Sequence, residues 1–310
     1  MPSLDIVIVN WNAGKRLQRC ISSIATAQRA SFNIDRVVVV DNASSDGSLE
    51  GLQPVGLPLV VIANPANRGF AAACNQGAGE STADYLLFLN PDVVLEPCAL
   101  EESVTLMQQP ENARIGICGI QLINSTGEVA RSCARIPRAA HFFAMATGLE
   151  RIAQSRFPGA LMEEWDHRSS CMVEHVIGAF FWVRRSLFSS LGGFDERFFV
   201  YLEDIDFSCR ARQAGWNSYY LATVRAEHSG GGCSEHVKAT RLFYALRSRI
   251  LYAYKHLPAT SATVVLLLTI VVEPVVRLGR ALFRGSFAEL AEVSDGYWKL
   301  WKCAAQGMRQ

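Results

Sequence analysis

The sequence predicts an α/β protein, with a mixed sheet flanked by helices and a helical C-terminal extension. Three observations support this prediction. The first ninety residues alternate apolar runs of strand length with helix-like segments. Most of these runs are apolar on every residue, which is typical of parallel strands covered on both faces. Beyond residue 235 the chain has longer apolar and basic segments with helical spacing.

Composition and charge describe a globular protein. The chain has 310 residues, half of them apolar, and a formal net charge of +1, which indicates a sizeable core and no nucleic-acid partner. The charge is uneven, because the residues from Glu235 onward include 11 Lys and Arg against 5 Asp and Glu. A basic, apolar tail indicates an anionic surface as partner, most simply a membrane face.

Cysteine usage and the first residues indicate the compartment. The nine cysteines form no CxxC pair and no metal-ligand spacing, which favours reduced, buried thiols in a cytosolic protein. The opening MPSLDIVIVNW has the pattern of a strand that contains a carboxylate, and not of a signal peptide. We therefore expect a cytoplasmic protein that is peripheral at the inner face of the cell membrane.

Strands and helices alternate in the first part of the chain. Leu17, Ile21 and Ile24 share one face of the first expected helix. The expected strands are 4–10, 36–40, 57–63 and 84–90, and the expected helices are 15–28, 47–52 and 69–79.

The middle of the chain has a less regular pattern. Residues 136–172 mix aromatic, charged and turn residues, and we expect a variable, mobile segment on the acceptor side of the site. The glycine-rich stretch 229–234 is expected to be flexible. Further strands are expected at 114–120, 174–185 and 217–228, with a helix at 203–216.

The C-terminal region is predicted to be helical. Residues 241–257 place apolar side chains on one face and basic ones elsewhere. Residues 262–272 form an eleven-residue apolar stretch before Glu273, too short to span a bilayer as a straight helix. Two interpretations remain open. One is a monotopic or re-entrant membrane element, and the other is a helix packed on the catalytic domain or on a second subunit.

Polar residues follow each of the four early strands. In open α/β sheets, ligands bind outside the carboxyl ends of the strands, so these four ends predict a ligand site. The sequence has no GxxxxGK loop, no GxGxxG after the first strand and no GxSxG elbow, so a bound nucleotide is held in another way. The polar ends are 10–12, 41–42, 64–67 and 90–92.

One of these ends offers a ligand for a hard cation. Asp92 follows a buried strand with Asn90 two residues earlier, and Mg²⁺ takes oxygen ligands that it shares with diphosphates. His228 ends another strand, beside glycines. Alone, Asp92 is typical of a turn and His228 of the surface. Together with the four polar strand ends, they predict a metal site.

Three carboxylates open the helix at 203–216, behind a run of aromatic residues. Acids in a first turn often serve only as caps. Glu203, Asp204 and Asp206 would, however, lose solvent beside the aromatic rings and repel one another. This raises at least one pKa toward the range of a general base.

Six segments in order along the chain carry a family resemblance. They are VIVNWN, VVVVDNASSDGS, NRGFAAACNQG, LLFLNPDV, the stretch from GAFFWVRR to QAGW, and EHSGGGCS. Together they resemble inverting nucleotide-sugar glycosyltransferases of family 2, with the Rossmann-like GT-A fold. The resemblance covers about residues 4–235 and implies a catalytic domain over 1–235, followed by a separate helical region over 236–310.

The resemblance implies a donor pocket at the strand ends. Asp41 would accept a hydrogen bond from the pyrimidine N3–H. Asn67 and Gly69 would close the nucleotide site, with Asn75 nearby. The residues lining the base and ribose pocket would be Asn10, Trp11, Asn12, Asp41 and Asn42.

It also implies where the diphosphate and the sugar lie. Asp92 would bind a metal, Mg²⁺ or Mn²⁺, with His228 as a second ligand. The family's usual Asp-x-Asp motif has Asn90 at its first position here, and the NPD form is similar to the rhamnosyltransferase branch. Gly178 and Ala179 would leave room for the sugar.

The carboxylates and arginines of the helix at 203–216 receive roles in the same way. Asp204 would be the base that deprotonates the acceptor hydroxyl, and Glu203 would shape its environment. Arg210 and Arg212 would either contact phosphate or hold the helix.

The implied reaction is transfer of L-rhamnose from dTDP-L-rhamnose, with inversion, to a saccharide or polyprenyl-diphosphate-linked acceptor. Three alternatives stay open: a family 2 transferase that uses a UDP-sugar, a catalytically silent nucleotide-sugar-binding assembly protein, and a nucleotidyltransferase. The last is disfavoured, because no glycine-rich lead precedes Lys15 and Arg16. A homodimer through residues 236–305 is a further expectation.

Overall fold

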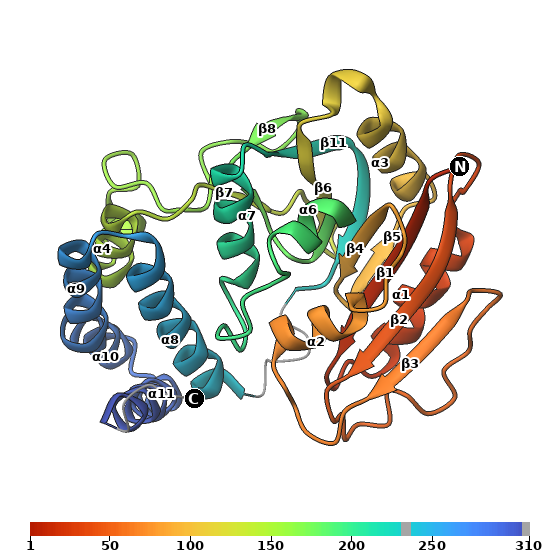
Figure 1. Ribbon diagram of the computed structural model, residues 1–310. Coiled ribbons are helices and arrows are strands. Elements are labelled where there is room, and N and C mark those ends of the chain that lie inside the picture. The colour runs from red at the N-terminus through yellow and green to blue at the C-terminus, as the bar shows by residue number, and fades with distance from the viewer. Residues whose placement is uncertain (231–236, 306–310) are drawn as a thin grey trace. The chain divides into compact units, whose positions relative to one another are not determined.

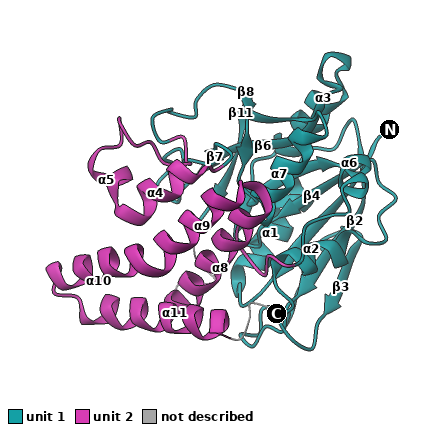
Figure 2. Ribbon diagram, turned by 60° about the vertical axis from the view of Figure 1, so that its left-hand side comes forward, with its two compact units in different colours: residues 1–136, 163–196, 203–233 teal, residues 137–162, 197–202, 234–310 magenta. Residues whose placement is uncertain are grey.

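The computed structural model describes residues 1–230 and 237–305 (Figure 1). The chain forms two compact units (Figure 2). Unit 1 comprises residues 1–136, 163–196 and 203–233, and unit 2 comprises residues 137–162, 197–202 and 234–310. Unit 2 thus takes in two segments from before residue 235 as well as the C-terminal region. The flexibility expected for 229–234 lies, from residue 231 on, outside the described residues.

Unit 1 is an α/β unit whose elements alternate as the sequence predicts. In chain order they are β1 (Ser3–Asn10), α1 (Lys15–Thr26), β2 (Asn33–Asp41), β3 (Leu59–Ala63), α2 (Phe70–Ala78), β4 (Tyr85–Leu89), β5 (Val93–Leu95), α3 (Ala99–Gln108), β6 (Ile115–Ile123), β7 (Cys133–Ala134), β8 (Cys171–Val173), β9 (His175–Val176), β10 (Phe180–Arg184), α6 (Arg185–Ser190), α7 (Glu203–Gln213) and β11 (Asn217–His228).

Within the described residues, nine strands form one mixed sheet in the order β3-β2-β1-β4-β10-β6-β11-β5, with β8 beside β11. Strands β3, β2, β1 and β4 are parallel neighbours. Their carboxyl ends therefore meet at one edge of the sheet, as the four polar strand ends predict. Strand β10 runs antiparallel to β4, so Phe180 at its start lies beside Leu89 at the end of β4.

Alternating residues of β1 face two different helix layers. Ile6 and Ile8 belong to the core that also holds side chains of α1 and α3. The opposite face packs against α2 at Gly77, where an added Cβ would lie 2.4 Å from a methyl group of Val7. Gly77 therefore allows α2 to approach the sheet closely. Helix α2 begins at Phe70, next to Gly69, whose carbonyl accepts a hydrogen bond from Asn42 at the end of β2.

A cluster of phenylalanine rings fixes α7 on this second face. Phe181 of β10 lies 5.9 Å from Phe207 of α7, and Phe194 lies 5.3 Å from Phe207, between ring centroids. Phe88 of β4 joins them through Phe194 at 4.9 Å. Buried aromatic clusters of this kind hold elements rigidly, so the first turn of α7, with its carboxylates, has a fixed place on the sheet.

Two local predictions are wrong. Residues 47–52, expected to be a short helix, form turns, because Gly47 and Gly51 adopt positive φ angles of 72° and 71°. Strand β3 is not covered on both faces, since Val60 and Val61 are 43% and 45% exposed. The reason is its place at the end of the strand order, where one neighbour is missing.

Unit 2 is helical. Residues 136–172, expected to be a variable segment, contain two of its helices. Helices α8 and α11 pack through Leu246, Ile250, Val293 and Tyr297. The elements are α4 (Ala139–Thr147), α5 (Leu149–Ile152), α8 (Lys238–His256), α9 (Ala259–Leu267), the π-type turn η3 (Leu268–Val272), α10 (Glu273–Phe283) and α11 (Phe287–Ala305).

Helices α9 and α10 join through η3 into one helix, Ala259–Phe283, of 25 residues, which contains an 18-residue window of mean hydropathy 2.0. By length and composition it is the one helix in the described chain that could cross a membrane. The apolar stretch 262–272 thus belongs to a longer helix than its own length indicates. Glu273 does not end it, because its carboxylate is buried in unit 2, pairs with Arg249, and lies 2.7 Å from Arg277.

Candidate active site

The ends of β1 and β2 are joined by side-chain hydrogen bonds. The amide nitrogen of Asn10 donates to Oδ1 of Asp41 at 2.6 Å and to the Ser48 hydroxyl at 2.8 Å. The backbone N–H of Ser44 donates to Oδ2 of Asp41 at 3.0 Å. Asn10 is fully buried and Asp41 is nearly buried. The buried Asn10 amide therefore fixes the orientation of the Asp41 carboxylate. Sequence reasoning missed the part that Ser48 plays in this contact.

The loop that follows β1 is tied to the loop that follows β2. The side-chain oxygen of Asn12 accepts from the Ser45 N–H at 2.8 Å, and Asp46 accepts from the Gly14 N–H at 2.7 Å. Asn12 itself has a positive φ of 54°, a conformation that asparagine tolerates better than most residues. Trp11, in the loop after β1, is half-buried. The residues predicted to line the nucleobase pocket therefore lie on two loops that are joined by hydrogen bonds.

The end of β2 is also linked to the start of α2. The amide of Asn42 donates to the Gly69 carbonyl at 3.0 Å and accepts from Asn64 at 3.0 Å. Asn67 accepts from the Gly69 N–H at 2.9 Å, and Gly69 has a φ of 88°. Gly69 suits this conformation because it lacks a Cβ. Asn67 and Gly69 thus lie beside Asn42, at the end of β2.

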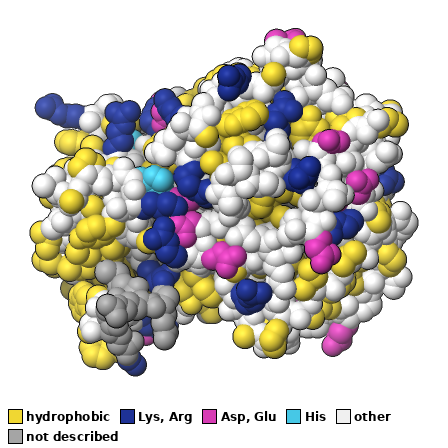
Figure 3. Space-filling model, viewed as in Figure 1, with side chains coloured by type: hydrophobic (Ala, Val, Ile, Leu, Met, Phe, Trp, Pro, Cys, Tyr) yellow, Lys and Arg dark blue, Asp and Glu magenta, His cyan; other side chains and the backbone are white. Residues whose placement is uncertain are grey.

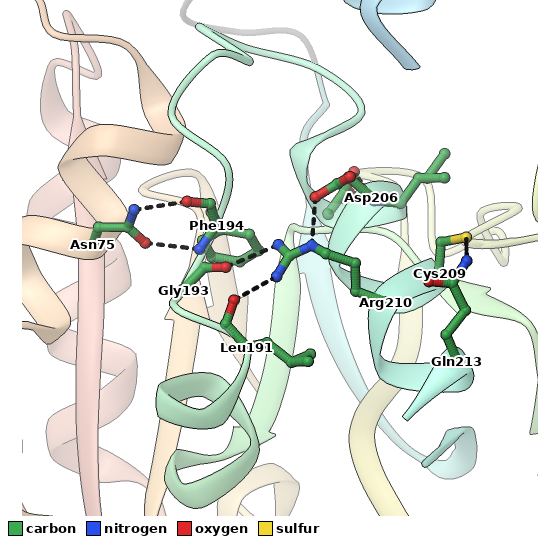
Figure 4. Close-up of polar contacts among 10 residues, drawn as sticks. Asn75, Leu191, Gly193, Phe194, Asp206, Cys209, Arg210 and Gln213 are labelled. Carbon is green, nitrogen blue, oxygen red and sulfur yellow. Dashed lines mark hydrogen bonds and ion pairs between the residues drawn. The ribbon is translucent and has the colours of Figure 1, made fainter. Parts of the chain in front are cut away.

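Asn75 and Arg210 make contacts within the protein (Figure 4). Asn75 donates to the Phe194 carbonyl at 2.8 Å and accepts from its N–H at 2.9 Å. The Arg210 guanidinium donates to Asp206 and to two backbone carbonyls in the loop before Phe194, each at 2.8 Å. This geometry favours the alternative in which Arg210 holds the helix. Arg212 is exposed and pairs with Glu174.

Asp92 and His228, distant in sequence, lie together. Strand β5 pairs with β11 so that Val93 stands opposite His228, and the His228 Nε2 lies 3.4 Å from the Asp92 Oδ1. In the part of the chain that the structure describes, no group of three or more His, Cys, Asp or Glu side chains could hold a metal. A carboxylate and an imidazole suit Mn²⁺ or Mg²⁺ only if a ligand such as a diphosphate completes the coordination.

The same edge carries Asp204. The backbone N–H of Gly178 donates to the Asp204 Oδ2 at 2.8 Å, and the Ile205 N–H donates to Oδ1 at 2.8 Å. The next residue, Ala179, accepts from the Asn90 N–H at 2.9 Å. Gly178 and Ala179 thus link Asp204 to Asn90, which follows β4. An added Cβ on Gly178 would lie 3.1 Å from the carboxylate, so Gly178 makes room for Asp204 itself.

The carboxylates of α7 have opposite pKa shifts. Burial, and then the charges of Asp204 and Asp206, raise the pKa of Glu203 well above its usual value. Burial alone would also raise the pKa of Asp204. The charge and hydrogen bond of His175, together with the two backbone N–H groups, outweigh burial and lower this pKa. The pKa shift expected for at least one carboxyl group thus falls on Glu203, whereas the pKa of Asp204 is lowered.

His175 is a residue that sequence reasoning missed. Its Nε2 lies 3.5 Å from the Asp204 Oδ2, and its ring is buried. The available signal was a histidine that follows Glu174 at the start of an apolar run, three residues before Gly178.

Comparison with known proteins identifies the family. The sequence model of glycosyl transferase family 2 matches residues 5–192. This range is more than half of the chain, and the chain therefore belongs to glycosyl transferase family 2.

Several named relatives are rhamnosyltransferases. The chain is 28% identical over 269 residues to the N-acetylglucosaminyl-diphospho-decaprenol L-rhamnosyltransferase of Mycobacterium tuberculosis (strain CDC 1551 / Oshkosh), covering 79% of this chain and 84% of that protein. It is 24% identical over 233 residues to the O-antigen chain rhamnosyltransferase WbaN of Salmonella anatum, covering 74% and 67%. The chain is thus a glycosyltransferase, and rhamnosyltransferases are among its relatives.

Solved structures identify the fold. The mannosyltransferase PcManGT from Pyrobaculum calidifontis, in complex with GDP-Man and Mn²⁺, matches with a TM-score of 0.56 at 15% identity, covering 99% of this chain and 87% of that one. The fold is therefore GT-A, as the sequence resemblance implies.

Proposed function

We propose that this protein transfers L-rhamnose from dTDP-L-rhamnose to a hydroxyl of a lipid-linked saccharide, with inversion at the anomeric carbon. The observation that carries the reaction type is the carboxylate of Asp204, held by two backbone N–H groups at the sheet edge that also carries Asp41 and Asp92. The relatives named as rhamnosyltransferases support the sugar, and the lipid-linked substrate in one relative's name supports the acceptor class.

Each group in the site then has a defined task. Asp41 receives the donor's base, and the loops around Asn12 and Gly69 border the ribose and diphosphate. The acceptor oxygen attacks the anomeric carbon while its proton passes to an oxygen of Asp204, and the bond to the dTDP leaving group breaks on the opposite face. Glu203 precedes the base on α7, and burial, together with the charge of Asp204, raises its pKa.

Asp92 and His228 would hold the metal. The pair offers one oxygen and one nitrogen ligand close to Asn90. These two ligands suit Mg²⁺ or Mn²⁺ if oxygens of the donor diphosphate complete the coordination. A divalent ion there would neutralise negative charge on the departing diphosphate.

Donor identity is tested by thermal shift. We expect dTDP-L-rhamnose to raise the melting temperature more than UDP-sugars do, and to raise it further with Mn²⁺ or Mg²⁺, because ligand that binds only the native state stabilises it. The matched comparison is dTDP alone against UDP alone, which isolates the base. A larger shift with any UDP-sugar would reassign the donor.

A peripheral membrane location fits unit 2. By sequence, unit 2 contains 15 Lys and Arg against 6 Asp and Glu, a formal charge of +9, whereas the rest of the chain carries −8. Basic residues near a membrane surface each contribute roughly 1 kcal/mol of attraction to anionic lipids.

The helix Ala259–Phe283 presents an apolar outer face. None of its exposed residues is charged, and they include Val264, Leu267, Val271 and Val275, which lie three or four residues apart. Two of its polar residues, Thr269 and Glu273, are buried inside unit 2. Figure 3 shows hydrophobic side chains gathered over α9 and α10. Because one side of the helix is bound to protein, we propose that it lies along the bilayer surface and does not span it.

The double variant Leu267→Asp, Val275→Asp is expected to lose at least about tenfold in affinity for anionic vesicles, since each buried aliphatic side chain contributes about 1.5–3 kcal/mol. Co-sedimentation with phosphatidylglycerol-containing vesicles measures this. The control variant Val60→Asp, Val61→Asp changes two similarly exposed valines of β3 and should bind as the wild type does. Equal vesicle binding by all three proteins would contradict the proposal. A dimer that dissociates only in the first variant would assign the face to a second copy.

A further inference from the structure

His175 makes two polar contacts from a buried position. It belongs to β9 and is 1% exposed. On one side its Nδ1 lies 2.9 Å from the Ser208 hydroxyl, and on the other its Nε2 lies 3.5 Å from the Asp204 Oδ2. Ser208 and Asp204 are four residues apart on α7 and so share one helix face. The imidazole therefore spans that face and is aligned by both of its nitrogens.

The contact addresses a physical difficulty of the site. Asp204 has a side chain only 17% exposed, and burial disfavours the charged form of a carboxyl group. A base must nevertheless be ionised before it accepts a proton. The N–H groups of Gly178 and Ile205 supply two hydrogen bonds to the carboxylate. His175 supplies a third polar partner that can also be cationic.

The other ionisable groups around Asp204 do not supply this compensation. Glu203 precedes it on α7 and Cys74 faces both carboxyl groups from α2, and each would repel Asp204 if ionised. The charge of Asp206 contributes to the raised pKa of Glu203, and the Asp206 carboxylate is paired with Arg210 at 2.8 Å. Among the described residues of unit 1, His175 is thus the basic side chain in contact with Asp204.

We infer that His175 is a positioning residue for the reaction: it holds Asp204 in one orientation and in the ionised form that accepts the acceptor's proton. This inference rests on the proposed role of Asp204 as base. The Ser208 hydroxyl keeps the arrangement in both protonation states of the ring. It donates to Nδ1 when the ring is neutral and accepts from it when the ring is charged, so an N–H at Nε2 faces Asp204 in both cases.

The test is the pH profile of kcat in His175→Leu and His175→Gln. In the leucine variant the compensating partner is lost while burial persists, so the pKa of Asp204 rises. Protonated Asp204 cannot act, and kcat should therefore fall by at least about tenfold between pH 8 and pH 5.5, a fall absent from the wild type. The glutamine amide retains an uncharged donor near the Nε2 position, so this variant should show a smaller fall. Donor KM should change little in both.

The matched control is His167→Leu. His167 is equally buried in unit 1, but its ring accepts a hydrogen bond from the Cys133 N–H instead of facing α7. It should lower the melting temperature without changing the shape of the pH profile. An unchanged profile in a folded, active His175→Leu protein would overturn the inference, as would the same change in His167→Leu. Failure of the proposed function is distinct, since it would appear as no rhamnosyl transfer by the wild type at any pH.

Discussion

We expect replacement of Asp204 with Asn to lower kcat by at least about 10²-fold, the scale on which general bases act, and to leave donor affinity nearly unchanged. The amide has the same shape, and its oxygen can still accept the 2.8 Å hydrogen bond from the Gly178 N–H. It cannot take up a proton from the acceptor hydroxyl. Release of dTDP in the presence of acceptor measures turnover, and calorimetry with dTDP-L-rhamnose measures affinity.

Asp206→Asn is the matched control, because this carboxylate opens the same helix but is fully buried and bound to Arg210. This variant should be less stable, because Arg210 loses the partner that helps it to hold the loop at Leu191 and Gly193. It should retain most of the turnover. If Asp204→Asn turned over at a rate near that of the wild type, the base would have to be another group. If neither the wild type nor a variant released dTDP with any acceptor, the silent nucleotide-sugar-binding alternative would be favoured.

The sheet and its polar edge could be predicted because their signals are local. An apolar run that ends in Asp41-Asn42 or Asn90-Pro91-Asp92 contains both the strand and its polar end within a few residues. Parallel pairing then brings those ends together without further information. The same locality explains one error, since whether Val60 and Val61 are covered depends on the strand order, which no local pattern contains.

The site's supporting contacts could not be predicted for a related reason. Asn75 contacts Phe194 across 119 residues of sequence, and His175 contacts Asp204 across 29. A strand histidine has the same local pattern whether it faces a carboxylate or the core. Sequence reasoning therefore gave Arg210 two open alternatives, and only the backbone carbonyls around Leu191 and Gly193 favour one of them.

Replacing Asp92 with Ala should remove the part of donor affinity that depends on a divalent metal. The change deletes the single carboxylate of the proposed ligand pair and leaves His228, a neutral or cationic group that binds Mg²⁺ poorly. Loss of groups that support a metal site costs about 10–100-fold in affinity, and loss of a direct ligand should cost at least as much. Calorimetry of dTDP-L-rhamnose binding, with and without Mg²⁺ or Mn²⁺, measures the metal-dependent increment.

Asp41→Asn separates this effect from a general weakening of the pocket. Asp41 is held by Asn10 and Ser44 at the base end of the proposed donor site. Its amide replacement should weaken donor binding by a similar factor with and without metal, because the lost interaction is with the pyrimidine. Asp92→Ala should instead make the two conditions equal. An Asp92→Ala protein that still binds the donor more tightly with metal would contradict the ligand role and direct attention to Asn90, the other polar side chain of the motif.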